Sequence, residues 1–205
     1  MQWRGIPSLA VRIKLRAYAT ILLMLPADPC DAPVAAAGPF AGADVVAILH
    51  ERGWLTSESS LEQHAWCERA ASMLGGYAAD RAALADLLGL VFQYDAGEII
   101  SRVESHVVLS RYAARDVLRH AAPLLLDGTP LTSERFKEVV TALKEDMELR
   151  GRELFHPIRL ALAGRAGEGE LDRVILLLDG AAALSFAAPV KSARARILEF
   201  CSALD

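Results

Sequence analysis

The feature that most constrains the fold of this chain is the spacing of apolar residues just after Thr132. Four of them recur at intervals of 4, 3 and 4 residues: Phe136, Val140, Leu143 and Met147. This spacing places the four side chains on one face of an α-helix, which Thr132 or Ser133 can cap. Related spacings recur from Ala43 onward, and we find no convincing alternation typical of a strand. We therefore predict an all-α fold, a bundle or cage of about seven to nine helices.

Capping residues and glycines mark several helix ends in the first half of the chain. Gly53 follows the helical pattern ADVVAILHER and is expected to close it. Ser59 and Glu62 have the spacing of a capping box at the start of the next helix. Asp80 can cap the helix after that one.

Two later helices carry predictions about which side chains face the core. A helix from Leu109 to Leu125 would place Tyr112 on its inner face. A last amphipathic helix from Val190 to Leu204 would place Leu198 inward and Arg196 toward solvent.

The first residues differ from the rest, because they are basic, apolar and rich in proline. The apolar run Ala17–Leu25 is far shorter than the roughly 20 residues that a membrane-spanning helix needs, so we predict no membrane partner. Prolines and aspartates separate this run from the small residues that follow it, which disfavours a secretory signal. The three cysteines are odd in number and far apart, and this predicts a reducing cytoplasm rather than a disulfide framework.

One segment, the arginine-rich stretch (residues 150–171), concentrates positive charge. Four arginines fall within it: Arg150, Arg152, Arg159 and Arg165. From Leu149 to Arg165 these four oppose one glutamate, a net charge of +3 in a chain of net charge −4. Pro157 is suited to start a short helix and Gly164 to end it, with loops on both sides. Guanidinium groups at the ends of such a helix suit phosphate oxygens and guanine edges.

The motifs in this stretch resemble a known family. The run GRELFHPIRLALAG, followed by AGEGELDRVILLLDG, is similar to the end of the anticodon-binding domain of bacterial glutamyl-tRNA synthetases, which are class I synthetases. That family has a Gly-Lys-x-Leu-Phe-x-Pro-Leu-Arg block, a small-residue helix ending in Thr-Gly, a Gly-Pro-x-Leu loop, and a closing Leu-Gly helix end. The upstream run GWLTSESSLEQHAWCERAASMLGGYAADRAALADLLGLVFQ resembles the linker helices that precede it. The similarity covers roughly residues 44 to 185, and several blocks in one order are hard to obtain by chance.

The resemblance implies a tRNA-binding role for seven residues: Arg150, Arg152, Arg159, Gly164, Arg165, Glu168 and Leu171. Arg159 matches the arginine expected to face anticodon bases, and the loop from Gly164 to Leu171 matches the anticodon-contacting loop. Arg150 and Arg152 are better suited to backbone phosphates, which position an RNA without specifying its sequence. Arg165 suits either role.

The chain also departs from the family pattern. The departures are Ala163-Gly164 for Thr-Gly, Gly169-Glu170 for Gly-Pro, and Asp179-Gly180 for the closing Leu-Gly. Glu168 and Glu170 place carboxylates where an RNA backbone is expected to approach, and each would repel phosphate.

The resemblance also predicts a domain organisation. Residues 1–43 form a divergent segment with a proline- and glycine-rich linker, residues 44–130 a helical linker subdomain, and residues 131–205 an anticodon-binding-like helical subdomain.

The sequence contains no motif for catalysis. The His-Ile-Gly-His-like and Lys-Met-Ser-Lys-Ser-like motifs of such synthetases are missing, as are a phosphate loop and a nucleophile elbow. If the chain is part of an enzyme, that enzyme is expected to be a glutamate–tRNA ligase. His64 and Cys67 are too few for a zinc site, and a solvated helix face explains the acidic residues around His106. We predict no cofactor and no metal.

Three interpretations remain open from the sequence. The first is a tRNA-binding module, with tRNA-Glu as its partner and a full-length synthetase or a separate catalytic chain beside it. The second is a helical protein–protein interaction module, derived from that domain, that no longer binds RNA. The third is a fragment of a longer ligase reading frame.

Overall fold

The structure, a computed structural model, describes residues 39–204. Predictions that concern residues 1–38, including the apolar run and Cys30, lie outside the described residues. The described residues belong to one compact unit, and the predicted subdomain boundary near residue 130 stays a prediction.

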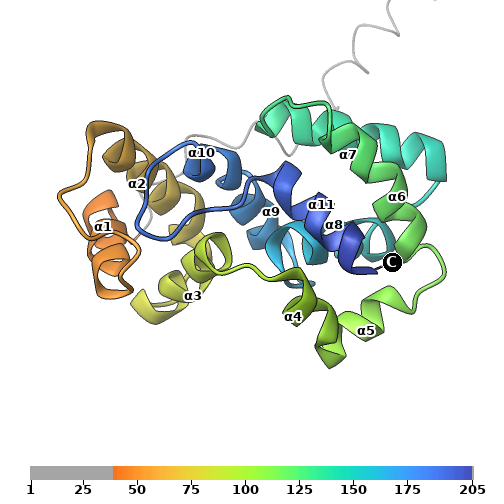
Figure 1. The fold of residues 1–205 in the computed structure, drawn as a ribbon, viewed down its shortest axis with the longest axis horizontal. Coiled ribbons are helices and arrows are strands. Elements are labelled where there is room, and N and C mark those ends of the chain that lie inside the picture. The colour runs from red at the N-terminus through yellow and green to blue at the C-terminus, as the bar shows by residue number, and fades with distance from the viewer. Residues whose placement is uncertain (1–38, 205) are drawn as a thin grey trace, which may run out of the picture. The chain divides into compact units, whose positions relative to one another are not determined.

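The described residues form eleven α-helices and one 3₁₀ turn and contain no strand (Figure 1), which confirms the all-α class. There are more helices than predicted, because several connections are turns between short helices. The elements are α1 (Gly42–Glu51), α2 (Leu61–Leu74), η1 (Gly75–Tyr77), α3 (Arg81–Phe92), α4 (Ala96–Ser101), α5 (Val103–Leu109), α6 (Ala114–Leu125), α7 (Ser133–Met147), α8 (Arg152–Ala163), α9 (Gly169–Ile175), α10 (Leu178–Ala182) and α11 (Ala193–Leu204).

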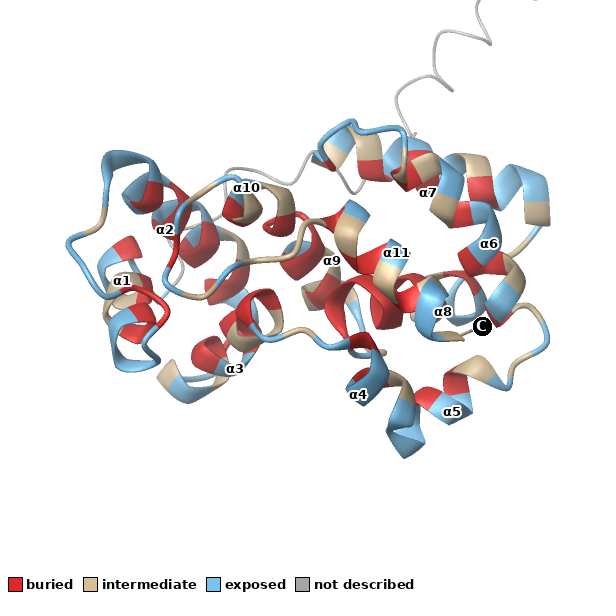
Figure 2. Ribbon diagram, in the orientation of Figure 1, coloured by how far each residue is buried: buried red, intermediate tan, exposed pale blue. Residues whose placement is uncertain are grey.

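Helix α8 is the central element of the described residues. It packs against α5, α6, α9 and α11, and buried residues gather where α8, α9 and α11 meet (Figure 2). Its second half, from Pro157 to Ala163, is buried at every position. A helix that is buried all round is typical of a core. Arg159 is the one polar side chain in this buried half of α8, and it must therefore find its hydrogen-bond partners inside the fold.

Several predicted helix ends are confirmed. Asp80 and Thr132 cap α3 and α7 through side-chain hydrogen bonds to the backbone. Gly53 follows α1 with a φ of +70°, and the predicted capping box lies one residue later, at Ser60 and Gln63. The apolar face of α7 is buried as predicted at all positions except Met147, which is partly buried.

The start of α8 differs from the prediction. The helix begins at Arg152, after Gly151 with a φ of +58°, so that Arg152 lies in the first turn rather than in a loop. Pro157 lies inside the helix instead of starting it, and a proline there cannot donate to the carbonyl of Glu153. Gly164 ends α8 in the left-handed conformation, as predicted, with a φ of +76°.

The prediction of one continuous helix from Leu109 to Leu125 is wrong. Helix α5 ends at Leu109 and α6 begins at Ala114, with a turn between them. Tyr112 lies in this turn and is 100% exposed, rather than facing inward. On α6 itself the helical spacing holds, since Val117, Leu118 and Ala121 are buried, so the error is confined to the turn. Leu198 on α11 is also 45% exposed rather than buried.

Arg196 on α11 faces the core, which corrects the prediction that it faces solvent. Its side chain is 0% exposed and donates to four backbone carbonyls: Leu162 at 2.8 Å, Leu90 at 2.9 Å, Lys191 at 3.1 Å and Val91 at 2.5 Å. Three of these carbonyls belong to the last turns of α3 and α8, where helix carbonyls lack internal donors and the helix dipole is negative. The Tyr94 ring lies 4.4 Å from the guanidinium carbon. Burial lowers the pKa of Arg196 to about 10, and the side chain ties α3, α8 and α11 together.

Candidate nucleic-acid interface

Arg159, the residue matched to base recognition, lies inside the fold. Its Nε and Nη2 atoms donate to the two carboxylate oxygens of Asp172 on α9, each at 2.7 Å, and its Nη1 donates to the carbonyl of Gly167 at 2.6 Å. Its guanidinium also lies 4.9 Å from the centre of the Phe155 ring. The side chain is only 9% exposed and that of Asp172 is 24% exposed. Arg159 thus joins α8 to α9 and holds the loop between them.

This loop is also held at its start. A Cβ on Gly164 would lie 2.9 Å from Cδ1 of Ile99, so both the positive φ and the limited space favour glycine there. The Arg102 side chain, at the junction of α4 and α5, donates to the carbonyl of Gly164 at 3.3 Å. Residues 164–168 therefore have fixed ends, and between them Arg165 is exposed while Ala166 packs against the core.

The seven predicted site residues divide into an exposed and a buried group. The exposed group is Arg150, Arg152, Arg165 and Glu168, and the buried group is Arg159, Gly164 and Leu171. Arg152, the first residue of α8, forms an ion pair at 3.2 Å with Glu168, the last residue before α9. Both side chains are largely exposed. An ion pair this exposed contributes little to stability, so Arg152 is accessible to another anion. In the buried group, Arg159 and Gly164 take part in the hydrogen bonds that hold the two ends of the loop. RNA contact by any of the seven remains a prediction.

Phe155, in the first half of α8, lies between the two groups. It belongs to the Leu-Phe pair of the family block, and its ring is only partly buried. Leu154, its neighbour, is buried at 0% exposure instead. The ring of Phe155 supports the guanidinium of Arg159 from one side and has Lys144 5.6 Å from its centre. Phe155 thus shapes the cationic surface as well as packing against the core.

A second basic segment, which the sequence reasoning missed, lies against α8. Arg111, in the turn between α5 and α6, contacts Nδ1 of His156 on α8 at 3.3 Å. The pKa of His156 lies below its usual range, because burial and the guanidinium groups of Arg111 and Arg152 disfavour the imidazolium. The signal in the sequence is four arginines spread from Arg102 to Arg119. It is weak because acidic residues lie among them.

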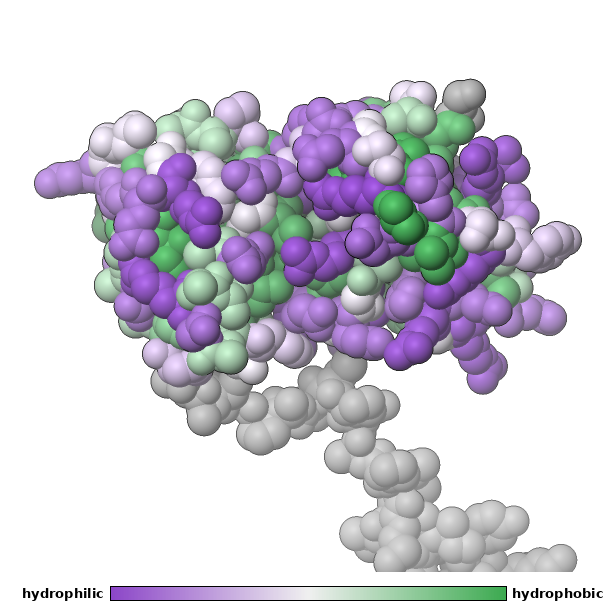
Figure 3. All heavy atoms as spheres, turned by 90° about the horizontal axis from the view of Figure 1, so that it is seen from below, coloured by the Kyte–Doolittle hydropathy of each residue, from purple (hydrophilic) through white to green (hydrophobic). Residues whose placement is uncertain are grey.

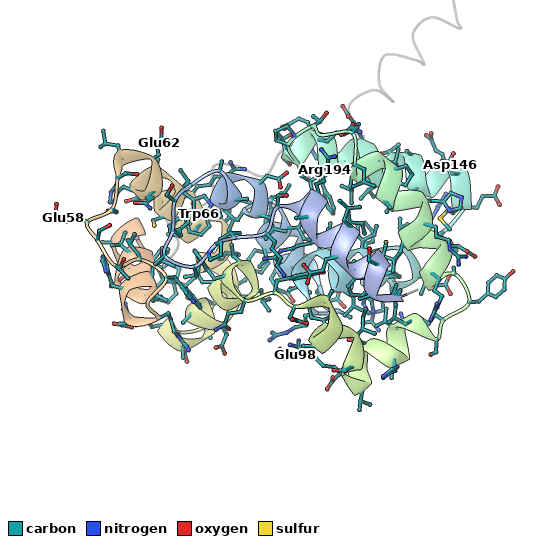
Figure 4. The ribbon with its side chains drawn as sticks, in the orientation of Figure 1. Glu58, Glu62, Trp66, Glu98, Asp146 and Arg194 are labelled. Atoms are coloured by element: carbon teal, nitrogen blue, oxygen red, sulfur yellow. The ribbon has the colours of Figure 1, made fainter. Side chains whose placement is uncertain are left out.

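A cleft of about 660 Å³ opens beside the loop after α8. Its lining comes from the segment after α1, from α3 and α4 with the residues that follow them, and from the loop. It includes Arg52, Gln93, Glu98, Arg102 and Arg165. Glu98 lies on α4 at the lower edge of the view in Figure 4, and it pairs with Arg102 at 2.8 Å. Mixed donors and acceptors of this kind suit the polar edges of an unpaired base better than a phosphate.

Comparison with known protein families identifies the family of this chain. The family model described as "Anticodon binding domain" matches residues 35–183. The chain belongs to this family. The match to the anticodon-binding domain includes the whole arginine-rich stretch and ends directly after α10.

The domain is also similar to curated glutamate–tRNA ligases. It is 28% identical over 130 residues to the glutamate–tRNA ligase of Bacillus velezensis, covering 63% of this chain and 26% of that protein. It is 33% identical over 75 residues to glutamate–tRNA ligase 2 of Syntrophus aciditrophicus, covering 37% of this chain and 15% of that protein. The chain spans about a quarter of the length of the first of these relatives. No solved structure matches it significantly.

Residues 39–204 form neither a membrane span nor a metal-binding cluster. No helix in this range is long and apolar enough to cross a membrane. Nor does this range hold a group of three or more His, Cys, Asp or Glu side chains placed to bind a metal. Cys67 is buried, and burial raises the pKa of its thiol to about 11, which disfavours the reactive thiolate.

Proposed function

We propose that this domain binds tRNA at its anticodon region, through the arginine-rich stretch and the loop after α8. One observation carries the proposal: the family match covers α8 and α9, and exposed arginines stand at both ends of α8. Arg150 and Arg152 lie before or in its first turn, and Arg165 follows its last residue. Exposed guanidinium groups suit phosphate oxygens, and the polar cleft beside Arg165 suits an unpaired base.

We further propose tRNA-Glu as the RNA, since the similar curated proteins are named glutamate–tRNA ligases. The role of the domain would be recognition during glutamylation in the cytoplasm. The chemical step requires a catalytic region that these 205 residues do not contain, supplied by a full-length synthetase or by a separate catalytic chain.

Fluorescence anisotropy with a labelled tRNA-Glu transcript, over a series of salt concentrations, tests this proposal. Affinity should fall steeply with salt, because each neutralised phosphate releases counterions. Arg150→Ala should weaken binding of tRNA-Glu and of an anticodon-swapped transcript alike, and should reduce the salt slope by about one. Binding of the wild-type protein that ignores both salt and anticodon identity would overturn the proposed function.

The pair between Glu168 and Arg152 gives a second prediction. Glu168→Gln keeps the shape of the side chain, removes one carboxylate from the loop, and frees the guanidinium of Arg152. We expect this variant to bind tRNA-Glu about 2- to 5-fold more tightly at low salt, with the gain shrinking as salt rises. Glu58→Gln serves as the control, because Glu58 is exposed at the end of the structure remote from α8 (Figure 4). An equal gain in both variants would show a general charge effect instead of a local one.

A further inference from the structure

Two basic segments, far apart in sequence, contact each other in the fold. The first is the arginine-rich stretch. The second, the α5–α6 segment (residues 102–119), holds four arginines against Glu104 and Asp116, a net charge of +2 in a chain of net charge −4. Both α5 and α6 pack on α8. Arg102 reaches the carbonyl of Gly164, and Arg111 reaches the ring of His156. The α5–α6 segment is therefore an extension of the proposed RNA surface.

The α5–α6 segment also concentrates exposed apolar side chains. Six large apolar residues are exposed among the described residues, and three of them lie within ten positions of each other: Val103 at 75%, Val107 at 59% and Tyr112 at 100% exposure. Figure 3, which views the molecule from below, shows a small strongly hydrophobic patch among hydrophilic residues in the half of the surface that contains α4 and α5. Isolated exposed apolar side chains are ordinary, but a cluster of them marks a contact surface.

Tyr112 is the member of this cluster with no packing role. Its whole side chain is in solvent, in the turn that follows α5, and it is adjacent in sequence to Arg111. Arg115 follows in the first turn of α6 and is exposed. Proteins that bind single-stranded nucleic acids commonly combine exposed aromatic rings with cationic side chains. The ring stacks on a base, and the cations contact the phosphate backbone.

We propose that the α5–α6 segment is a second contact surface for the same RNA, in which Tyr112 stacks on an unpaired base and Arg111 and Arg115 contact the flanking phosphates. This inference rests on the proposed tRNA binding. The positive charge of the segment and its continuity with the arginine-rich stretch favour RNA as its occupant. A second copy of this chain, whose net charge is −4, is the outcome that the test must exclude.

The test compares Tyr112→Ala with Tyr112→Phe in tRNA-Glu binding over the salt series. Tyr112→Ala should weaken binding roughly 5- to 150-fold, as expected for one lost base stack, at every salt concentration and with the salt slope unchanged. Tyr112→Phe keeps the ring and should bind within about 2-fold of wild type. Tyr77→Ala, at a half-exposed tyrosine after α2, is the control and should have no effect. Because Tyr112 is fully exposed, its variants should unfold at the wild-type temperature.

The results separate this inference from the proposed function. Wild-type binding that depends on Arg150 but not on Tyr112 overturns only the inference. An equal loss in Tyr112→Phe and Tyr112→Ala overturns stacking, because a hydroxyl contact would then be the cause. A change in the mass of the particle in solution on Tyr112→Ala assigns the patch to a second copy of the chain. Failure of wild-type protein to bind tRNA at any salt concentration overturns the proposed function itself.

Discussion

Replacing Arg196 by methionine is expected to lower the stability of the domain by about 3–5 kcal/mol, one of the largest effects in this chain. The substitution keeps much of the side-chain volume but removes the guanidinium donors of Arg196 that reach carbonyls in the last turns of α3 and α8. Those carbonyls are buried and would be left without partners. For a domain of this size the loss corresponds to a fall of roughly 6 to 20 °C in melting temperature.

The matched control is Arg194→Met on the same helix. Arg194 is exposed and lies on α11 (Figure 4), so its substitution should change stability by less than about 0.5 kcal/mol. Arg196→Lys is a second variant, which keeps the positive charge. Its single ammonium group cannot reach all the carbonyls to which the planar guanidinium of Arg196 donates. This variant should be intermediate in stability. Thermal unfolding followed by circular dichroism measures all three, and an Arg196→Met variant as stable as wild type would contradict the role assigned to this side chain.

The case of Arg196 shows which parts of the fold a sequence pattern reveals. Caps such as Asp80 and Thr132 act within three residues, and the apolar face of α7 repeats within one helix, so both are visible in the local sequence. Arg196 instead meets carbonyls more than 30 residues away at the ends of two other helices. From its own helix alone, a charged residue is expected to face solvent. Only the tertiary arrangement supplies the acceptors that make it a core residue.

The candidate site likewise has features that the local sequence reveals and features that depend on tertiary packing. The resemblance identifies a stretch that the family match includes, because its glycine, proline and arginine positions follow one order along the chain. It does not identify which arginines are accessible, since accessibility depends on partners that the family pattern does not include. Tyr112 is placed inward by helical spacing, and the break between α5 and α6 reverses this placement. The surface formed by Arg111 and His156 depends on packing between residues 45 positions apart.

Arg159 carries the second large prediction, because its pairing with Asp172 gives it a structural role that can be separated from base recognition. Arg159→Ala and Asp172→Ala should each lower stability by about 2–4 kcal/mol, since either change leaves a mostly buried partner uncompensated. The double variant should lose less than the sum of the two single losses, with a coupling of about 1–3 kcal/mol. Chemical denaturation measures this cycle. Asp146→Ala, at an exposed residue near the end of α7 (Figure 4), is its control.

The effect of the same variants on RNA distinguishes two roles for Arg159. If Arg159 acts by holding the loop on Gly167 and α9, both single variants should weaken tRNA binding to a similar extent, because both release the loop. If Arg159 instead leaves Asp172 to read a base, Asp172→Ala should maintain or strengthen binding while Arg159→Ala weakens it by about 1–3 kcal/mol and relaxes anticodon preference. The bidentate contact at 2.7 Å, the third hydrogen bond to Gly167 and the low exposure of the guanidinium favour the first result. Parallel losses would leave phosphate contact to the exposed arginines at the two ends of α8, with Arg159 setting the geometry of the loop between them.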